Sequence, residues 1–252
     1  FIAGPAGSGK TTVLNQLGLQ DFNRTPTAGE TPSTALKGII QGFKTPVLLS
    51  NVYDLKSGRV IEWPGTLPYL LKEVNGVKIG IIGLIPDDFV SLTPVQVRNG
   101  LYIEGMLQST LRQSRLLRSL GAELIVVMTH AGVICGENTA QDLRLPLSKV
   151  NFESEKSDLC EQKGLIADFL QRLPQGVVDV LITGRTLQKT ANKINGIAVV
   201  SGFGQGSSFN MTEIVYDKTK KQIDWAESKI HQPILLCHEF FKETSDCYPD
   251  DP

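Results

Sequence analysis

Short apolar runs recur along the chain and end in small or polar residues. They are rich in Val and Ile, nearly continuous in apolar character, and close on Gly, Asn, Asp or His. Strands covered on both faces of a sheet have this pattern, so each run predicts a buried strand. The predicted strands cover residues 45–54, 76–85, 122–132, 177–184 and 197–204.

Segments with helical periodicity lie between these runs. Residues 106–121 carry leucines at positions 107, 111, 116, 117 and 120 and end at a glycine, which predicts an amphipathic helix with a glycine stop. Further helices are predicted over residues 11–19, over 33–43 with Ser33 as N-cap, and over 161–174 with Pro174 as the stop. Alternating strands and helices predict an α/β architecture built in layers.

The last part of the chain has a different pattern. Apolar and polar residues alternate over residues 209–236 around the stretch DKTKKQ, which predicts an antiparallel hairpin at the edge of the sheet. Residues 138–158 are polar and predict a surface loop. We expect a single domain over residues 1–252 that lacks its first strand, with residues 232–252 as the segment leaving it.

Composition narrows the class of protein. The 252 residues are 41% hydrophobic and 20% charged, with a formal net charge of −1, so nothing indicates a nucleic-acid partner. The longest apolar runs have the length of buried strands and are too short to span a bilayer, so we expect no membrane span. Composition does not decide whether the chain binds a protein partner.

The four cysteines are Cys135, Cys160, Cys237 and Cys247, and their spacing fits no zinc site. Two disulfides would have three possible connectivities, and the simplest pairs Cys135 with Cys160 and Cys237 with Cys247. The alternative is four buried free thiols in a cytosolic protein. We favour disulfides because Cys237 and Cys247 flank a polar terminal segment, where a covalent link stabilises most.

Residues 4–11, GPAGSGKT, match the phosphate-loop pattern G-x-x-x-x-G-K-[ST]. In such a loop Gly4 and Gly9 would let backbone amides face the phosphates, Lys10 would reach the β/γ oxygens, and Thr11 would hold magnesium. The strand ends do not support this function, since none of the apolar runs 79–85, 124–128 and 178–182 is followed directly by Asp-Asp or Asp-Glu. A P-loop protein that binds Mg-nucleotide is therefore an alternative only.

The strand ends resemble another family more closely. The stretches PVLLSN, GVKIGIIGL, THAG, DVLITGRT and GFGQGSSFNMTEIVYD follow one another in this order. The set resembles the catalytic domain of the 5'-nucleotidase branch of the calcineurin-like metallophosphoesterases over nearly the whole chain. The resemblance implies a four-layer sandwich of two mixed β-sheets flanked by helices. It also implies two divalent metal ions (Mn, Zn or Mg), hydrolysis of nucleotides or other phosphoesters, and a periplasmic or extracellular location.

Most metal-ligand positions of that family are substituted in this chain. Pro5 stands where the resemblance places a bridging Asp, and Glu30 and Thr31 replace the Asn-His of a G-N-H motif. Arg185 replaces the first His of the G-H-T-H motif, so only His130 matches a ligand position. One imidazole cannot hold a dinuclear centre, and we expect Arg185 to fill the vacated space and pair with Glu30.

These substitutions favour a degenerate, non-catalytic 5'-nucleotidase-like domain that acts as a binding or structural module. On this interpretation the domain has no cofactor and no catalytic residue, and His130 is a remnant of the former site. The first alternative is an active metal-dependent phosphoester hydrolase with His130 as a ligand. The second is the P-loop nucleotide binder that uses residues 4–11.

Overall fold

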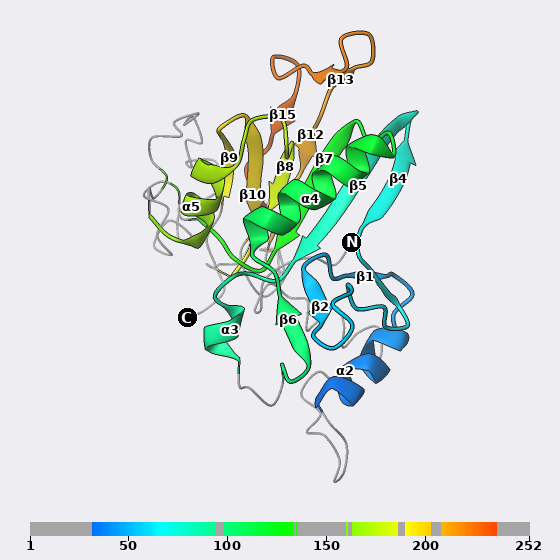
Figure 1. Cartoon of the computed structure of the whole chain (residues 1–252). Helices are drawn as coiled ribbons and strands as arrows, with labels where there is room; N and C mark the ends of the chain where they lie inside the picture. Colours follow the sequence, from blue (N-terminus) through cyan, green and yellow to red (C-terminus); the bar gives the residue numbers. More distant parts are fainter. Residues whose placement is uncertain are drawn as a thin grey trace, which may run out of the picture.

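The computed structural model describes residues 32–93, 98–133, 135, 160, 163–185, 190–202 and 208–235. Within this part of the chain a six-stranded sheet with the order β4-β5-β7-β8-β10-β9 forms the centre (Figure 1). The strands β5, β7, β8 and β10 are mutually parallel and correspond to four of the predicted buried strands. The bounds are β4 Leu70–Val74, β5 Val77–Leu84, β7 Leu124–Thr129, β8 Val180–Ile182, β9 Thr190–Ile194 and β10 Ile197–Ser201.

Two antiparallel strands that the apolar pattern did not indicate close the sheet at both sides. β4 forms a hairpin with β5 and β9 forms one with β10. Each turn is an Asn-Gly pair in which both residues have positive φ: 51° and 74° at Asn75-Gly76, and 51° and 80° at Asn195-Gly196. This is the type I′ geometry that Asn-Gly favours in two-residue hairpins, so the two dipeptides were the signal for these strands.

The predicted strand over residues 45–54 is split into β1 (Val47–Leu48) and β2 (Val52–Asp54). β1 pairs with β3 (Thr66–Leu67), and β2 pairs with β6 (Leu101–Ile103). Between β1 and β2 lie Ser50 and Asn51, which are fully buried. Their side chains bond to backbone groups of other segments and so interrupt the strand, which corrects the prediction of one continuous element.

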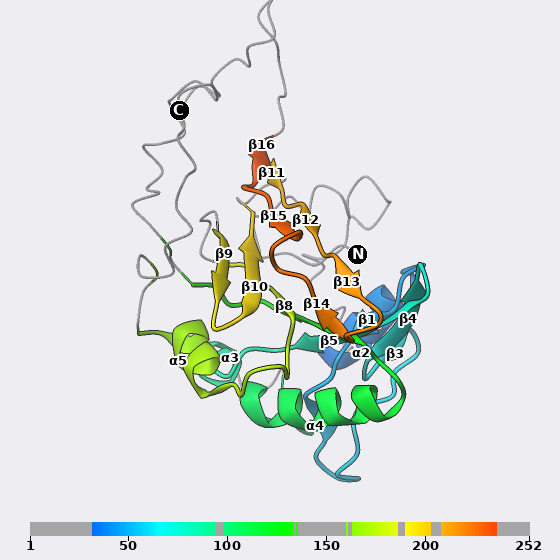
Figure 2. The ribbon, with the colours of Figure 1, turned by 90° about the horizontal axis from the view of Figure 1, so that it is seen from above.

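Helices cover one face of the six-stranded sheet. α4 (Met106–Ser119) and α5 (Leu165–Arg172) lie on this face, and both agree with predicted helices to within a few residues (Figure 2). The predicted helix over 33–43 is α2 (Pro32–Gln41), and the short α3 (Phe89–Leu92) follows β5. The core lies between α4, α5 and the sheet, where buried side chains from all of these elements pack together. They include Ile82, Leu117, Ile125, Ile166, Leu170 and Leu181.

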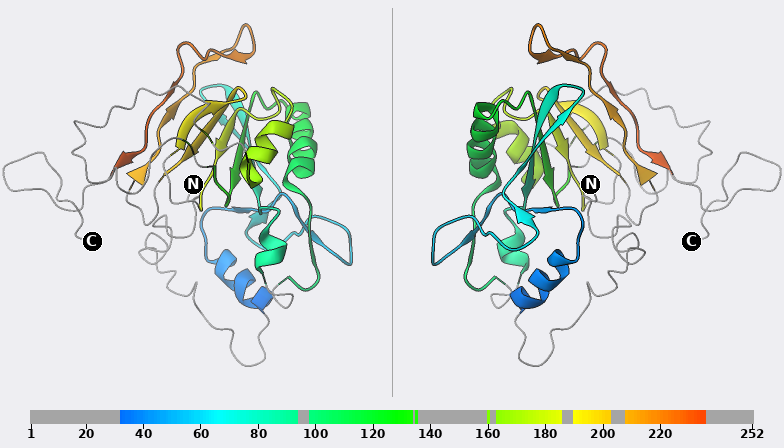
Figure 3. Two further views of the ribbon diagram at one scale, coloured as in Figure 1. Left: turned by 90° about the vertical axis from the view of Figure 1, so that its left-hand side faces the viewer. Right: turned by 90° about the vertical axis from the view of Figure 1, so that its right-hand side faces the viewer.

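Residues 208–235 form the predicted antiparallel hairpin, called the ribbon below. Its ladders are β11 (Ser208–Phe209) with β16 (Ile234–Leu235), β12 (Thr212–Glu213) with β15 (Lys229–Ile230), and β13 (Tyr216–Asp217) with β14 (Gln222–Ile223). The ribbon lies over the face opposite α4 and α5, not at the sheet's edge as predicted (Figures 2 and 3). Its tip is fixed to the β4–β5 turn, where Lys218 Nζ donates a 2.9 Å hydrogen bond to the Asn75 carbonyl.

The expected mixed α/β architecture with sheets flanked by helices is confirmed by this arrangement. The described residues supply helices, the central sheet and the ribbon as three successive layers (Figure 3). No helix among the described residues is long and apolar enough to cross a membrane. The single domain over residues 1–252 and the exit segment 232–252 stay predictions.

A disulfide joins Cys135 to Cys160, with an S–S distance of 2.08 Å, as the simplest connectivity predicted. Both half-cystines are buried, and Asn192 Nδ2 of β9 donates to Cys160 Sγ at 3.5 Å. The disulfide is therefore attached to the sheet close to where β9 begins. Cys237 and Cys247 lie outside the described residues, so their pairing stays a prediction.

Candidate functional site

The carboxyl ends of the parallel strands bring polar residues to one edge of the central sheet. β7 runs into His130, and β8 runs through Thr183 and Gly184 into Arg185. The Gly184 amide donates to the Ala131 carbonyl at 3.0 Å, so the segments that follow β7 and β8 lie side by side. Ligands of α/β proteins bind at this edge of the sheet, which makes it the candidate site.

Arg185 forms an ion pair with Asp88, which follows β5. The Nη1–Oδ2 distance is 2.6 Å, and the two side chains are 38% and 33% exposed. Arg185 adopts a φ of 77°, a left-handed conformation that is uncommon for a residue with a Cβ atom. The predicted partner Glu30 lies outside the described residues. The partner that the structure places beside Arg185 is Asp88, which the sequence did not single out because 97 positions separate the two.

Asp87, next to Asp88, has a different role at the same edge. Its Oδ1 accepts a 2.7 Å hydrogen bond from the amide of Met106, the first residue of α4. The residue at the N-cap position is Gly105, which offers no side chain, so Asp87 supplies the capping oxygen from another segment. A carboxylate there also interacts favourably with the helix dipole. The two neighbouring carboxylates are thus engaged with α4 and with Arg185 respectively.

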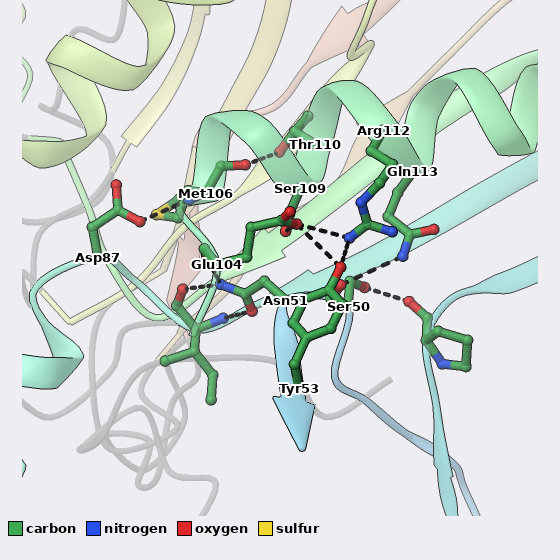
Figure 4. A network of polar contacts seen from close by, with 12 residues as sticks. Ser50, Asn51, Tyr53, Asp87, Glu104, Met106, Ser109, Thr110, Arg112 and Gln113 are labelled. Atoms are coloured by element: carbon green, nitrogen blue, oxygen red, sulfur yellow. Dashed lines mark hydrogen bonds and ion pairs between the residues drawn. The ribbon is translucent and has the colours of Figure 1, made fainter. Parts of the chain in front are cut away.

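Asn51 fixes the position of the segment that carries these two carboxylates. Its Nδ2 donates to the carbonyls of Ile85 and Glu104 at 2.8 and 2.9 Å, and its Oδ1 accepts from the Ile85 amide at 2.9 Å (Figure 4). The side chain is completely buried. It therefore joins the exit of β5 to Glu104, two residues before α4 begins, and holds Asp87 and Asp88 at the site's rim.

A second polar network attaches β2 to α4. The Glu104 carboxylate accepts hydrogen bonds from Tyr53 at 3.2 Å, from Arg112 Nη2 at 2.8 Å and from the Ser109 hydroxyl, and Arg112 also donates to the Tyr53 hydroxyl (Figure 4). Burial alone would raise the pKa of Glu104, but the bonds from Ser109 and Arg112 outweigh it and hold that pKa below its ordinary value. Burial raises the pKa of the Tyr53 phenol. Glu104 is therefore a structural carboxylate that stays ionised.

The described residues at this edge do not fit a dinuclear metal centre. No group of three or more His, Cys, Asp or Glu side chains in the described part of the chain could hold a metal ion. Asp88 Oδ1 and Thr129 Oγ1 are buried without a hydrogen-bond partner, but the guanidinium of Arg185 lies against Asp88 and repels a cation. His130 is an imidazole at the end of β7, where the resemblance places a ligand.

Several predicted site residues lie outside the described residues and stay predictions. They are Pro5, Glu30 and Thr31 of the substituted metal site, and Gly4, Gly9, Lys10 and Thr11 of the phosphate-loop alternative. Of the predicted set, His130 follows β7 and Arg185 follows β8, and these two strands are parallel neighbours, so both residues lie at one edge of the sheet.

Comparisons with known proteins find one curated protein with low sequence identity and several solved structures of similar fold. No family model matches the chain. Cell wall protein Lmo0130 of Listeria monocytogenes serovar 1/2a is 24% identical over 177 residues. The match covers 69% of this chain and 20% of that protein, so the chain spans only a small part of the curated relative's length.

Solved structures show a clear likeness in fold. The calcineurin-like phosphoesterase YfkN from Bacillus subtilis matches with a TM-score of 0.59 and 19% identity, over 89% of this chain and 66% of that one. A candidate 5'-nucleotidase from Staphylococcus aureus matches with a TM-score of 0.55 and 17% identity, over 80% of this chain and 34% of that one. The chain therefore has the fold of calcineurin-like phosphoesterases and 5'-nucleotidases.

Proposed function

We propose that this chain is a non-catalytic member of the 5'-nucleotidase-like fold that acts as a binding or structural module. The observation that carries the proposal is the Arg185–Asp88 ion pair at the end of β8. The resemblance places a metal-binding imidazole at this position. A guanidinium is always protonated and has no lone pair to offer a metal, so Arg185 cannot take over that role.

The ion pair places the permanent positive charge of Arg185 at this edge, where the carboxylate of Asp88 balances it. Arg185 and Asp88 come from different strand ends, and their 2.6 Å contact joins the segments after β8 and β5. A pair with both side chains about a third exposed adds only about 1 kcal/mol or less to stability. The more important effect of this pair is that it places a guanidinium and not a metal ligand at the site.

A location outside the cytoplasm belongs to the same proposal. The Cys135–Cys160 disulfide supports it, because disulfides persist in oxidising compartments. The relative in Listeria monocytogenes carries the name of a cell wall protein. Both observations favour a periplasmic or extracellular module.

The competing function is metal-dependent hydrolysis of a phosphoester, which the imidazole of His130 at the end of β7 favours. In active relatives the metals would activate water and bridge the phosphate. Here His130 could contribute one ligand, and the others would have to come from residues outside the described part. The two functions predict different results when release of phosphate is measured with added metal ions.

The test is turnover of AMP and p-nitrophenyl phosphate by the full chain with Mn²⁺, Zn²⁺ or Mg²⁺. We expect no release of phosphate above that of His130→Ala, and no shift of the melting temperature when any of these ions is added. His231→Ala is the matched control, because it removes an imidazole of the ribbon that pairs with Glu213. Turnover that is lost with a chelator and in His130→Ala, but kept in His231→Ala, would overturn the proposal.

A further inference from the structure

Three Asn-Gly pairs lie at exposed turns of the described structure. Asn75-Gly76 joins β4 to β5, Asn99-Gly100 directly precedes β6, and Asn195-Gly196 joins β9 to β10. Glycine has no Cβ atom, so its backbone nitrogen is open to the side-chain amide of the asparagine before it. Each pair is therefore a candidate for spontaneous deamidation of its asparagine.

Deamidation is a reaction of the chain with itself and with water. The glycine nitrogen loses its proton and attacks Cγ of the asparagine, the bond from Cγ to the side-chain nitrogen breaks, and that nitrogen leaves as ammonia. Water then opens the cyclic imide at either of its two carbonyl groups, which leaves aspartate or isoaspartate. No oxidant, reductant or cofactor takes part. The folded structure can change the rate through the freedom of the side chain and through the charge beside the reacting peptide group.

The asparagine side chain is held in place at one of the three turns. Asn195 Nδ2 donates a 3.0 Å hydrogen bond to the Leu170 carbonyl of α5. This bond must open before the side chain can turn toward the nitrogen of Gly196, which should slow the reaction about fivefold. The side chains of Asn75 and Asn99 make no hydrogen bond to another residue of the described part of the chain.

A lysine contacts the peptide group that reacts at Asn75. Lys218 Nζ donates a 2.9 Å hydrogen bond to the Asn75 carbonyl, which belongs to the same peptide group as the Gly76 nitrogen. A Cβ atom placed on Gly76 would lie only 2.8 Å from this Nζ, so the ammonium group lies directly against the peptide. When the nitrogen loses its proton, its negative charge spreads to the carbonyl oxygen. The ammonium group stabilises that charge, which should raise the rate about fivefold.

We propose that Asn75 is a site of spontaneous deamidation and that Lys218 promotes the reaction there. No lysine or arginine of the described residues donates to the carbonyl of Asn99 or Asn195. The rate therefore falls from Asn75 to Asn99, which lacks the cation, and falls again to Asn195, whose side chain is held. This inference does not depend on whether the strand-end site is catalytic.

Isoaspartate at position 75 changes how the ribbon is attached to the central sheet. It adds one methylene group to the backbone of a turn whose two residues have φ of 51° and 74°. A two-residue turn of this type fixes the register of its hairpin, so the added length moves the carbonyl that Lys218 bonds. The tip of the ribbon then loses its contact with the β4–β5 turn.

Peptide mass spectrometry of the full chain measures the three rates. The protein is incubated at neutral pH and physiological temperature, and digestion at intervals follows the change of each side-chain amide to an acid. Electron-transfer fragmentation separates isoaspartate from aspartate. We expect modification at position 75 to be about fivefold faster than at position 99, with position 195 slowest, and the three rates to become similar in urea. A rate at position 75 no higher than at position 195, or the same order of rates in urea, overturns the proposal.

Lys218→Gln separates the effect of the lysine from that of the exposed turn. We expect the rate at position 75 to fall about fivefold in this variant, because the charge that stabilises the deprotonated peptide is removed, while the rates at positions 99 and 195 stay the same. Lys220→Gln is the matched control, since it removes a lysine of the same ribbon tip that pairs with Asp217 at 3.5 Å. It should leave all three rates unchanged. An equal or higher rate at position 75 in Lys218→Gln contradicts the promoting role of the lysine.

Discussion

Asn51 is the residue on which the geometry of the strand-end site depends most. Its amide makes three hydrogen bonds of 2.8 to 2.9 Å with the backbone of Ile85 and Glu104, and it is completely buried. Asn51→Ala leaves these backbone groups without partners in the interior, and we expect it to lower the free energy of unfolding by about 3 kcal/mol. Urea denaturation followed by circular dichroism measures the change.

Asn51→Asp keeps the volume of the side chain and changes only its hydrogen-bonding groups, so it tests the contribution of the amide donor to stability. Aspartate keeps the oxygen that accepts from the Ile85 amide, but it turns a second oxygen toward the carbonyls of Ile85 and Glu104. The carboxylate oxygen and the two carbonyl oxygens are all acceptors, so none of them has a donor there. The loss of stability should therefore be at least as large as in Asn51→Ala. A clearly milder effect of Asn51→Asp would show that the amide donor is not needed.

Alanine substitutions at Gly83 and at Gly38 should have opposite effects on stability. A Cβ atom on Gly83 would lie 2.6 Å from Leu48 Cβ and 2.7 Å from the Leu48 carbonyl oxygen, whereas one on Gly38 would meet nothing within 4 Å. Gly83→Ala must therefore push β1 away from β5, at a cost of about 2 kcal/mol. Gly38→Ala in α2 should stabilise by up to about 1 kcal/mol, since alanine favours helix. Melting temperatures that move in the same direction would refute the comparison.

At the scale of elements, local sequence patterns located most strands, but the site needed tertiary information. The parallel strands β5, β7, β8 and β10 followed from continuous apolar runs, whereas the site roles of His130 and Arg185 stay predictions. The apolar pattern did not indicate the outer strands β4 and β9, because their sequences LLKEV and TANKI contain polar residues, although Asn-Gly marked both turns. Asp88 could not be paired with Arg185, because only the folded sheet brings the ends of β5 and β8 together.

Because Glu104 attaches β2 to α4 as an ionised carboxylate, the free energy of unfolding should depend on pH. Its folded pKa lies below the ordinary 4.5, so the carboxylate contributes stability above pH 4.5 and loses it as the pH falls through the folded value. Glu104→Gln removes this ionisation. The stability difference between wild type and Glu104→Gln should therefore be largest near pH 7 and shrink steadily below pH 4.5. Urea denaturation at several pH values measures it, and a difference that stays constant with pH would exclude the carboxylate as its origin.

At the scale of the whole molecule, a disulfide adds a covalent constraint to the packing of helices and strands. The Cys135–Cys160 disulfide closes a loop with a sequence separation of 25, and both half-cystines are buried against the sheet. The loop entropy that it removes from the unfolded chain corresponds to about 3 kcal/mol. The double variant Cys135→Ser/Cys160→Ser should lose about this much stability in urea denaturation under oxidising conditions.

Reduction of the disulfide provides the decisive comparison for this last prediction. Dithiothreitol should destabilise the wild type more than Cys135→Ser/Cys160→Ser, because the link between residues 135 and 160 is already absent from that variant. The control Cys237→Ser/Cys247→Ser keeps the link between residues 135 and 160 and should still respond to the reductant. If this control became insensitive while the first double variant kept its response, the stabilising disulfide would lie in the terminal segment and not beside the strand-end site.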